Sequence, residues 1–456
     1  MGEKDQNKKF QITDQLINEI INLIDNNDNK KLRDSFNDLH HADVAEILEE
    51  LHFDQATYII KLLDSEETSD ILMELDDDYR ERILNNLSAK EIAEEVEELD
   101  TDDATDIIAE LPEERQKKVI SEIEDKDHKA DIKELLKYDD DSAGGLMAKE
   151  LIKVNENWSV TRCVKEMRLQ ASEVTRVHSI YVVDNNNKLL GRLSLKDLLV
   201  ANPKSNIKSI YISKVDFVNV NDGAEHVASI MQKYDLGAIP VVDNNERLLG
   251  RITIDDIVDL IKEEAEKDYQ LAAGITQDVD VDDSIYKLSW ARLPWLFLGL
   301  LGGIGAAALM GGFEEVLLNY PILFYFTPLI AAMAGNVGVQ SSAIIVQGLA
   351  NDDIKDSINN RLFKETILSI LNGIILAAIL FLFIFYWRNN IDVALAISLS
   401  LVAVIIVAGI VGTFIPLFLN KRGIDPAIAT GPFITTSNDI FGILIYFMIA
   451  KIILQF

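Results

Sequence analysis

The stretch GPFITTSNDIFGILIYF, Gly431 to Phe447, has the composition of a membrane-spanning helix but contains one acidic residue, Asp439, near its middle. A charged side chain at the centre of a bilayer costs about 3 kcal/mol on insertion scales. Such residues face the interior of a helical bundle or a water-filled path, where they find a partner. We therefore expect Asp439 to mark a functional site inside a membrane domain.

Other apolar segments precede this stretch in the sequence. Windows without a charged residue run over 293–313, 316–351, 366–387 and 393–420, and a fifth, 427–449, is interrupted only by Asp439. Each reaches the roughly 20 residues that a helix needs to cross the hydrocarbon. Buried core helices of a soluble protein are the alternative, but four uninterrupted windows of this length argue against it. The sequence predicts an α-helical transmembrane domain with five spans.

The loops between these windows indicate an orientation in the membrane. Basic residues gather between spans two and three and between spans four and five, whereas the opposite side carries few: the first group is Lys355, Arg361, Lys364, Lys421 and Arg422, the second Arg388 and Lys451. The positive-inside rule then places residues 1–290 in the cytoplasm and the C-terminus outside. We expect a multi-pass protein of the cytoplasmic (inner) membrane, surrounded by lipid.

Charge divides the chain into two halves of different character. From residue 291 onward there are 8 Lys and Arg against 9 Asp and Glu, so residues 1–290 keep 35 of the 43 basic and 66 of the 75 acidic residues, a net charge of −31. Such a surface repels nucleic acid and attracts cations. Cys163 is the only cysteine, so no intrachain disulfide can form.

A twelve-residue repeat fills the first part of the acidic half. Leucines recur at positions 39, 51, 63, 75, 87, 99, 111 and 135, with Ile123 in the remaining place, and an apolar pair such as Ile107 and Ile108 precedes most of them. This spacing is typical of short helices that bury one stripe each. A fixed short period predicts a stacked array, so we expect an all-α superhelical domain over residues 1–140. One long helix is the alternative to this array. The acidic residues of the repeat either form an ordinary solvated face or bind cations.

A second repeat follows in the middle of the chain. YVVDNNNKLLGRLSLKDLLV (181–200) is echoed by PVVDNNERLLGRITIDDIVD (240–259) at an offset of 59 residues. Each unit reads as strand, Asn-rich turn, strand and helix, an order that suits a hairpin. These units resemble a tandem pair of CBS domains, which are α/β regulatory modules.

The CBS resemblance implies a possible nucleotide site in each unit. The family signature, often associated with ATP or another adenine nucleotide, is matched by Ser194 and Asp197 in the first unit and by Thr253 and Asp256 in the second. In the family the aspartate meets the ribose hydroxyls. Many such modules bind no nucleotide, and the alternative role for Asp197 and Asp256 is that of an acid favoured by the helix dipole.

The order of the three parts resembles the MgtE family of bacterial magnesium channels across nearly the whole chain. DDDSAGGLM (139–147) is similar to the family's entry into the first CBS domain, and AGNVGVQSSA (334–343) to its second span. Ala334 and Val339 depart from the family's usual residues. The resemblance implies a multidomain chain with an N domain, two CBS domains, a connecting (plug) helix and a pore domain, at residues 1–140, 141–203, 204–268, 269–291 and 292–456.

A transported Mg²⁺ ion would compensate the negative charge of Asp439 within the membrane. This cation keeps most of its water and is held by one or two carboxylates, so two Asp439 side chains facing each other across a homodimer would suit one hydrated ion. Asn336 and Gln340 share one helix face and could bind its waters, as could Thr435 beside Asp439. Hydrogen bonds between helices are the alternative role for Asn336 and Gln340. Oxygen ligands alone do not separate Mg²⁺ from Mn²⁺, Co²⁺ or Ni²⁺.

The resemblance also implies a sensor for cytosolic Mg²⁺ near the linker. In the linker that follows the second CBS domain, the family has acidic residues at the positions of Asp256, Asp259, Glu264 and Asp268. Lys262 and Lys267 replace residues that are commonly acidic in the family. Clustered carboxylates repel one another, and bound divalent ions favour a compact state. An ordinary solvated face is the alternative.

Taken with the resemblance, these observations predict a transport protein that is not an enzyme. The expected activity is that of a Mg²⁺-selective channel, closed when cytosolic Mg²⁺ binds to the acidic N and CBS domains. An ion-coupled exchanger of divalent cations, with Asp439 as its coupling site, is the alternative. The chain has no G-x-x-x-x-G-K-[ST] motif, which argues against an ATP-driven transporter.

Overall fold

The computed structural model describes residues 11–37, 39–172, 174, 176–277, 279, 281, 283–350, 354, 357–429 and 431–455. These fall into two compact units, residues 1–261 and 262–456, each of which is described by itself. Lys355, one of the residues used to predict the orientation, lies outside the described residues.

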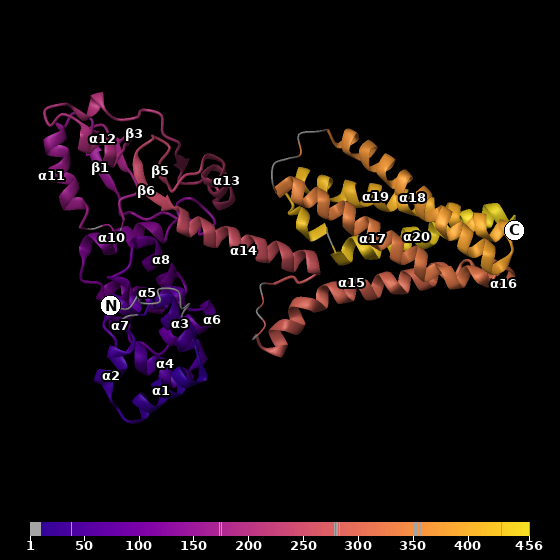
Figure 1. Cartoon of the computed structure of the whole chain (residues 1–456), viewed down its shortest axis with the longest axis horizontal. Coiled ribbons are helices and arrows are strands. Elements are labelled where there is room, and N and C mark those ends of the chain that lie inside the picture. Colours follow the sequence, from indigo (N-terminus) through magenta and orange to yellow (C-terminus); the bar gives the residue numbers. More distant parts are fainter. Residues whose placement is uncertain are drawn as a thin grey trace, which may run out of the picture. The chain divides into compact units, whose positions relative to one another are not determined.

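Short helices form the first part of unit 1, drawn in indigo and purple in Figure 1. They are α1 (Asp14–Asp25), α2 (Asn29–Asp34), α3 (His41–Glu50), α4 (Phe53–Ile60), α5 (Ser65–Glu74), α6 (Asp77–Leu84), α7 (Ala89–Val96), α8 (Thr101–Ala109), α9 (Glu113–Glu122) and α10 (Lys126–Leu135). Alternate helices pack on one another, α3 on α5, α5 on α7, α7 on α9 and α8 on α10. The predicted array of short helices is confirmed, and one long helix is excluded.

The twelve-residue period has a direct structural cause. The repeat positions lie at the end of a helix or within the few residues that follow it, as Leu51 and Leu75 do after α3 and α5. Eight of the nine repeat positions are buried. The apolar pairs before them, such as Ile107 and Ile108, are fully buried in the same core. Polar residues then start the next helix; Ser88, for example, forms a capping box with Glu91.

Two similar α/β modules complete unit 1. The first contains β1 (Ile152–Asn155), α11 (Val160–Gln170), β2 (Ile180–Val183), β3 (Leu189–Leu193) and α12 (Leu195–Val200); the second contains β4 (Val218–Asn219), α13 (Ala224–Tyr234), β5 (Ala238–Val242), β6 (Leu248–Thr253) and the start of α14 (Ile254–Ala273). Each module has a three-stranded sheet, in which the first strand is parallel and the third antiparallel to the middle one. The strand, turn, strand and helix order predicted from the repeat is confirmed.

The Asn-rich turns of the two modules are built in the same way. Asp184 Oδ1 accepts hydrogen bonds from the backbone N–H groups of Asn186 and Lys188, and Asp243 Oδ1 accepts the equivalent pair in the second module. These bonds lower the pKa of both carboxyl groups. The largest contribution comes from the backbone N–H of Lys188 for Asp184 and from that of Arg247 for Asp243. The repeated aspartates are therefore turn-forming residues.

Unit 2 contains five helices that are long and apolar enough to cross a membrane. They are α15 (Ile285–Gly311), α17 (Ile322–Ala350), α18 (Ile358–Arg388), α19 (Ile391–Lys421) and α20 (Gly431–Leu454). The prediction of five spans is confirmed. The second begins at Ile322 rather than near Val316, because Pro321 disfavours helical geometry at Tyr320, and residues before it form the separate short helix α16 (Glu314–Asn319). The segment 269–291 holds the end of α14 and the start of α15.

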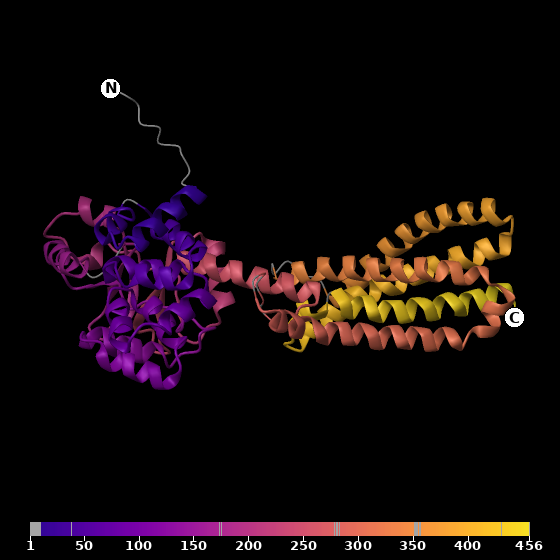
Figure 2. The same ribbon diagram turned by 90° about the horizontal axis from the view of Figure 1, so that it is seen from below.

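Helix α19 forms the centre of the membrane unit. It packs against α17, α18 and α20, and α20 also packs against α15, which runs alongside it in Figure 2. Gly412 of α19 approaches the backbone carbonyl of Gly338 on α17 so closely that no Cβ would fit. Small residues at such crossings permit close packing in membranes. By contrast, the apolar window of α15 is not buried within the chain.

Candidate ion site

The predicted pore residues come together in one cavity of about 420 Å³ in unit 2. Helix α17 contributes Asn336 and Gln340 and helix α20 contributes Thr435 and Asp439. Gln340 follows Asn336 by four residues and Asp439 follows Thr435 by four, so each pair occupies adjacent turns of one helix face. The remaining lining is apolar or glycine: Ala331, Ala332, Gly335 and Val339.

Gly335 allows the two lining helices to approach at the level of the carboxylate. A Cβ at this position would lie 3.1 Å from Cγ2 of Thr435 and 3.7 Å from Oδ1 of Asp439. Thr435 itself donates a hydrogen bond of 2.9 Å from Oγ1 to the carbonyl oxygen of Gly431, which leaves its oxygen lone pairs as acceptors. Asp439 is half-buried, whereas Asn336 and Gln340 are exposed in the single chain.

The donor set of this cavity suits a hard cation that keeps its water. It offers one carboxylate, two amide oxygens and one hydroxyl oxygen, and no sulfur or imidazole. In the described part of the chain, no three His, Cys, Asp or Glu side chains are grouped so as to hold a metal ion. The cavity can therefore bind waters of a hydrated ion, but one chain does not enclose a bare one.

A second group of predicted residues lies in unit 1, where Asp256 is close to the acidic first turn of α8. Oδ2 of Asp256 accepts hydrogen bonds from Oγ1 and the backbone N–H of Thr253, at 2.8 and 3.1 Å. Burial, together with the charge of Asp255, raises the pKa of Asp256. Burial and the neighbouring charge of Asp256 raise the pKa of Asp103 to about 7, and burial raises that of Asp102 well above its usual range.

Contacts between α8 and the CBS modules hold these carboxylates close to one another. Nη2 of Arg251 on β6 lies 3.3 Å from Oδ2 of Asp100. Thr101 donates from Oγ1 to Glu150 at 2.8 Å and accepts from the backbone N–H of Lys149. The acids thus meet at a contact between the helical array and the CBS pair.

Sequence reasoning selected Asp256 but missed Asp102 and Asp103. The two α8 residues belong to the segment TDDATD, which looks like the other acidic turns of the repeat. Nothing in its local pattern reveals that it meets a residue about 150 positions later. Only the fold shows that the charge of Asp256 lies beside them.

The other acids predicted for the sensor are less closely grouped. Asp259 of α14 is exposed, and Glu264 forms an ion pair of 3.0 Å with Lys267 on the same helix. Asp268 is half-buried in unit 2. The lysine at position 267 therefore neutralises one of the carboxylates that the resemblance selected.

The predicted nucleotide residues occupy equivalent places in the two modules. Ser194 is the N-cap of α12 and Asp197 lies in its first turn. Thr253 and Asp256 lie at the start of α14, where they hydrogen-bond to each other. The backbone N–H of Thr253 also donates to Asp256, which satisfies one of the free donors at the helix N-terminus. Asp256 therefore has a structural role in the first turn of α14, as the alternative interpretation expected.

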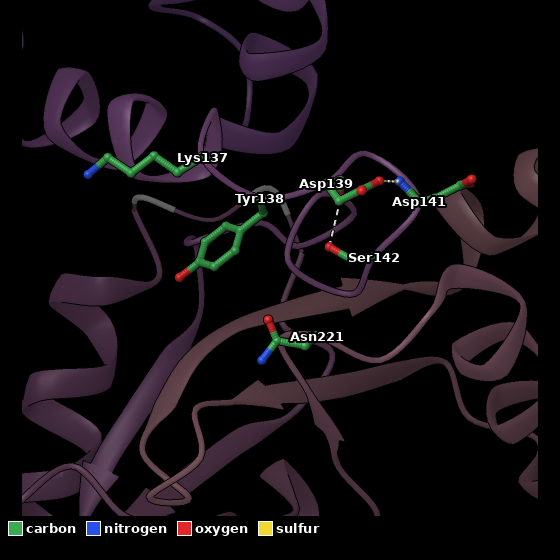
Figure 3. A pocket seen from close by; sticks show the side chains of 6 residues that line it. All are labelled: Lys137, Tyr138, Asp139, Asp141, Ser142 and Asn221. Carbon is green, nitrogen blue, oxygen red and sulfur yellow. Dashed lines mark hydrogen bonds between the residues drawn. The ribbon is translucent and has the colours of Figure 1, made fainter.

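A separate polar pocket of about 380 Å³ lies in unit 1, between the end of the helical array and the second CBS module (Figure 3). It is lined by Lys137, Tyr138, Asp139, Asp141, Ser142 and Asn221. Ser142 donates to the carbonyl oxygen of Asp139, and the carboxylate of Asp139 accepts from the backbone N–H of Asp141. The loop is thus held by its own hydrogen bonds.

Comparison with protein families identifies all three parts of the chain. A family described as divalent cation transporter matches residues 327–449, the MgtE intracellular N domain matches 39–141, and CBS domains match 143–204 and 207–263. These ranges include the membrane cavity, α8 and both CBS modules.

Individual relatives extend over most of the chain. Magnesium transporter MgtE of Bacillus subtilis is 31% identical over 438 residues, which is 96% of this chain and 97% of the relative. The protein of the same name from Enterococcus faecalis is 37% identical over 72% of each chain. A crystal structure described as the cytosolic domain of the Mg²⁺ channel MgtE in complex with ATP is 30% identical, with a TM-score of 0.50, over 54% of this chain and 99% of that one.

These likenesses agree with the architecture of a helical N domain, a CBS pair and five apolar helices, and the relatives that cover most of the chain are transporters. The chain belongs to the MgtE family of magnesium transporters.

Proposed function

We propose that the chain forms a homodimeric, Mg²⁺-selective channel of the cytoplasmic membrane, which rising cytosolic Mg²⁺ closes. The observation that carries this proposal is the cavity in which α17 and α20 bring together Asn336, Gln340, Thr435 and Asp439. Its single carboxylate and neutral oxygens suit an ion that retains water, as Mg²⁺ does.

The exposure of the cavity lining supports a dimer. Asn336 and Gln340 are exposed in the single chain although they lie within a span of high hydropathy. Polar side chains facing lipid are costly, so a second copy covering this face would enclose the water path and bring two Asp439 carboxylates to one ion. Two carboxylates are within the one or two that usually hold protein-bound Mg²⁺.

The acidic contact in unit 1 supports closure by Mg²⁺. Asp102, Asp103 and Asp256 have raised pKa values because they are held together away from water. A hydrated divalent cation beside them offsets their repulsion by its charge, without being ligated by all three, and favours the compact arrangement. We propose that this arrangement holds the pore closed, with Asp259, Glu264 and Asp268 as further cation-binding positions.

The orientation and the nucleotide sites are part of the same proposal. The N-terminal domains face the cytoplasm and the C-terminus lies outside, as the basic loops indicate. Ser194, Asp197, Thr253 and Asp256 are the positions at which ATP would bind. The solved relative in complex with ATP supports binding of this nucleotide by the cytosolic domains, and the choice of residues rests on the CBS signature. Isothermal titration of ATP into the protein and its Asp197→Ala variant tests it.

The pore proposal is tested by Mg²⁺ uptake into proteoliposomes. Asp439→Ala removes the carboxylate of the cavity, so we expect a loss of at least about tenfold in flux. Asp392→Ala is the matched control, because Asp392 is exposed at the start of α19 and lies outside the cavity. Near-normal Mg²⁺ uptake by the Asp439 variant would refute the assignment. Repeating the assay with Mn²⁺, Co²⁺ and Ni²⁺ measures selectivity.

A further inference from the structure

A second carboxylate, Glu365 of α18, enters the membrane unit away from the cavity. Oγ of Ser341 on α17 donates a hydrogen bond of 2.7 Å to its Oε1 atom. Glu365 is half-buried and lies two turns inside the third apolar helix. It directly precedes the charge-free segment 366–387, and its half-buried carboxylate needs a hydrogen-bond partner.

The hydrogen bond reaches the pore-lining helix directly beside a cavity residue. Gln340 lines the cavity, and Ser341, the next residue, is 5% exposed and faces the bundle. Successive residues on an α-helix are separated by about 100°. Holding Ser341 toward α18 therefore fixes the rotation of α17 that presents Gln340 and Asn336 to the cavity.

Helix α19 leaves room for this contact by means of a glycine. A Cβ on Gly409 would lie 2.9 Å from Oε1 of Glu365 and still closer to Oγ of Ser369. Ser369 is 2% exposed, and its hydroxyl has no hydrogen-bond partner among the described residues. The three helices α17, α18 and α19 thus meet around the Glu365 carboxylate, and α19 has no space for any side chain there.

We propose that Glu365 is a positioning residue, which sets the orientation of the pore face of α17 through its hydrogen bond to Ser341. This inference rests on the proposed function for its transport readout. It assigns the role to the acceptor oxygen of Glu365 rather than to its charge, because the contact in the structure is a hydrogen bond from a neutral hydroxyl. Glutamine offers the same oxygen at the same place without the charge.

Mg²⁺ uptake into proteoliposomes tests the role of the hydrogen bond. Glu365→Ala and Ser341→Ala should each lower flux about fivefold, since either leaves a buried polar group without its partner. The double variant should be no slower than the single ones, because both remove the same interaction. Glu365→Gln should retain the parent flux.

Ser342→Ala is the matched control for Ser341→Ala. Ser342 is the next residue on α17 and is fully buried, and within the part of the chain that the structure describes its hydroxyl has no hydrogen-bond partner. Its replacement by alanine removes the same atom from the same helix but leaves the bond to Glu365 intact. We expect it to retain the parent flux.

Labelling of an engineered cysteine gives a readout that does not depend on which ion crosses. Val339→Cys places a thiol in the cavity lining, and the native Cys163 is fully buried in the first CBS module. In this background Glu365→Ala and Ser341→Ala should change the labelling rate by a charged thiol reagent about fivefold, whereas Glu365→Gln and Ser342→Ala should not.

The outcomes separate this inference from the proposed function. A changed labelling rate without Mg²⁺ flux in the parent protein would support the positioning role and refute the transport assignment. Unchanged labelling in the Ser341 and Glu365 alanine variants would overturn the positioning role, whatever the flux. Glu365→Gln that is as impaired as Glu365→Ala would overturn it as well, because the charge would then be the functional property.

Discussion

Asp439 and Asp103 are acidic residues in two different surroundings, and the difference underlies the two roles that we propose for them. Asp439 lies in a cavity lined by neutral oxygens and small side chains, where no other described carboxylate competes with it. Asp103 lies with Asp102 and Asp256, so several negative charges share one buried place. The first arrangement suits one passing cation, whereas the second responds to the presence of a bound one.

The pKa of Asp103 leads to a prediction about pH. The value is about 7 in the folded protein against about 4 in an unfolded chain. Between these values the unfolded state has released its proton while the folded state keeps it, so stability contributed by this residue falls as pH rises from about 4 to 7. Asp103→Asn should reduce this decline, which thermal unfolding in metal-free buffer between pH 5 and 8 would measure.

The exposed Asp259 provides the control for that experiment. Asp259→Asn removes one negative charge at a solvated position, so the slope of stability with pH should match that of the parent protein. An equal slope in the Asp103 variant and its parent would contradict the burial of this carboxylate.

At the scale of single elements, the helical array stabilises itself by burying one stripe on each short helix. Leu84 of α6 is fully buried in the core of the array, whereas Leu169 of α11 is 61% exposed. Leu84→Ala should destabilise the protein by about 3 kcal/mol through lost burial and the cavity left behind. Leu169→Ala should cost less than about 0.5 kcal/mol. Urea unfolding followed by circular dichroism would show whether the two costs differ in this way.

Local patterns in the sequence predicted most elements but few of the contacts between them. Residue spacing predicts the twelve-residue period, the paired hairpins and the apolar windows. Each of these patterns reflects which side chains are buried within one element or against the element next to it. The i, i+4 spacing of Asn336 and Gln340 likewise predicted a shared face. The window 316–351 did not by itself locate the start of α17, although Pro321 was a visible signal for it.

The contacts that sequence reasoning missed join distant elements. Asp103 and Asp256 are about 150 residues apart, and Ser341 meets Glu365 only because α17, α18 and α19 pack together. Neither pairing has a periodic signal, because tertiary packing and not local structure creates it. The homodimer interface and the ion path likewise involve more than one element and remain proposals.

At the scale of the whole molecule, Mg²⁺ should stabilise the acidic part of the chain specifically. Residues 1–290 carry a net charge of −31, which any salt screens, but only a divalent cation bridges neighbouring carboxylates. Millimolar Mg²⁺ should therefore protect the full-length protein from proteolysis between its domains much more than NaCl at equal ionic strength. Equal protection by both salts would indicate screening alone.

Asp256→Asn is the variant that connects this protection to specific residues. It removes one of the carboxylates that meet α8, so more Mg²⁺ should be needed for the same protection and for closing the pore. An unchanged requirement in both assays would contradict the assignment of this contact as the sensor.

Current recording from the reconstituted full-length protein, with Mg²⁺ as the permeant cation, tests the central claim most directly. A channel lined by Asp439 should pass unitary currents that reverse at the Mg²⁺ equilibrium potential and that disappear as Mg²⁺ on the cytosolic side increases. Proton and sodium gradients should leave the reversal potential unchanged. A reversal potential that shifts with either gradient would contradict the account and identify the protein as a coupled exchanger.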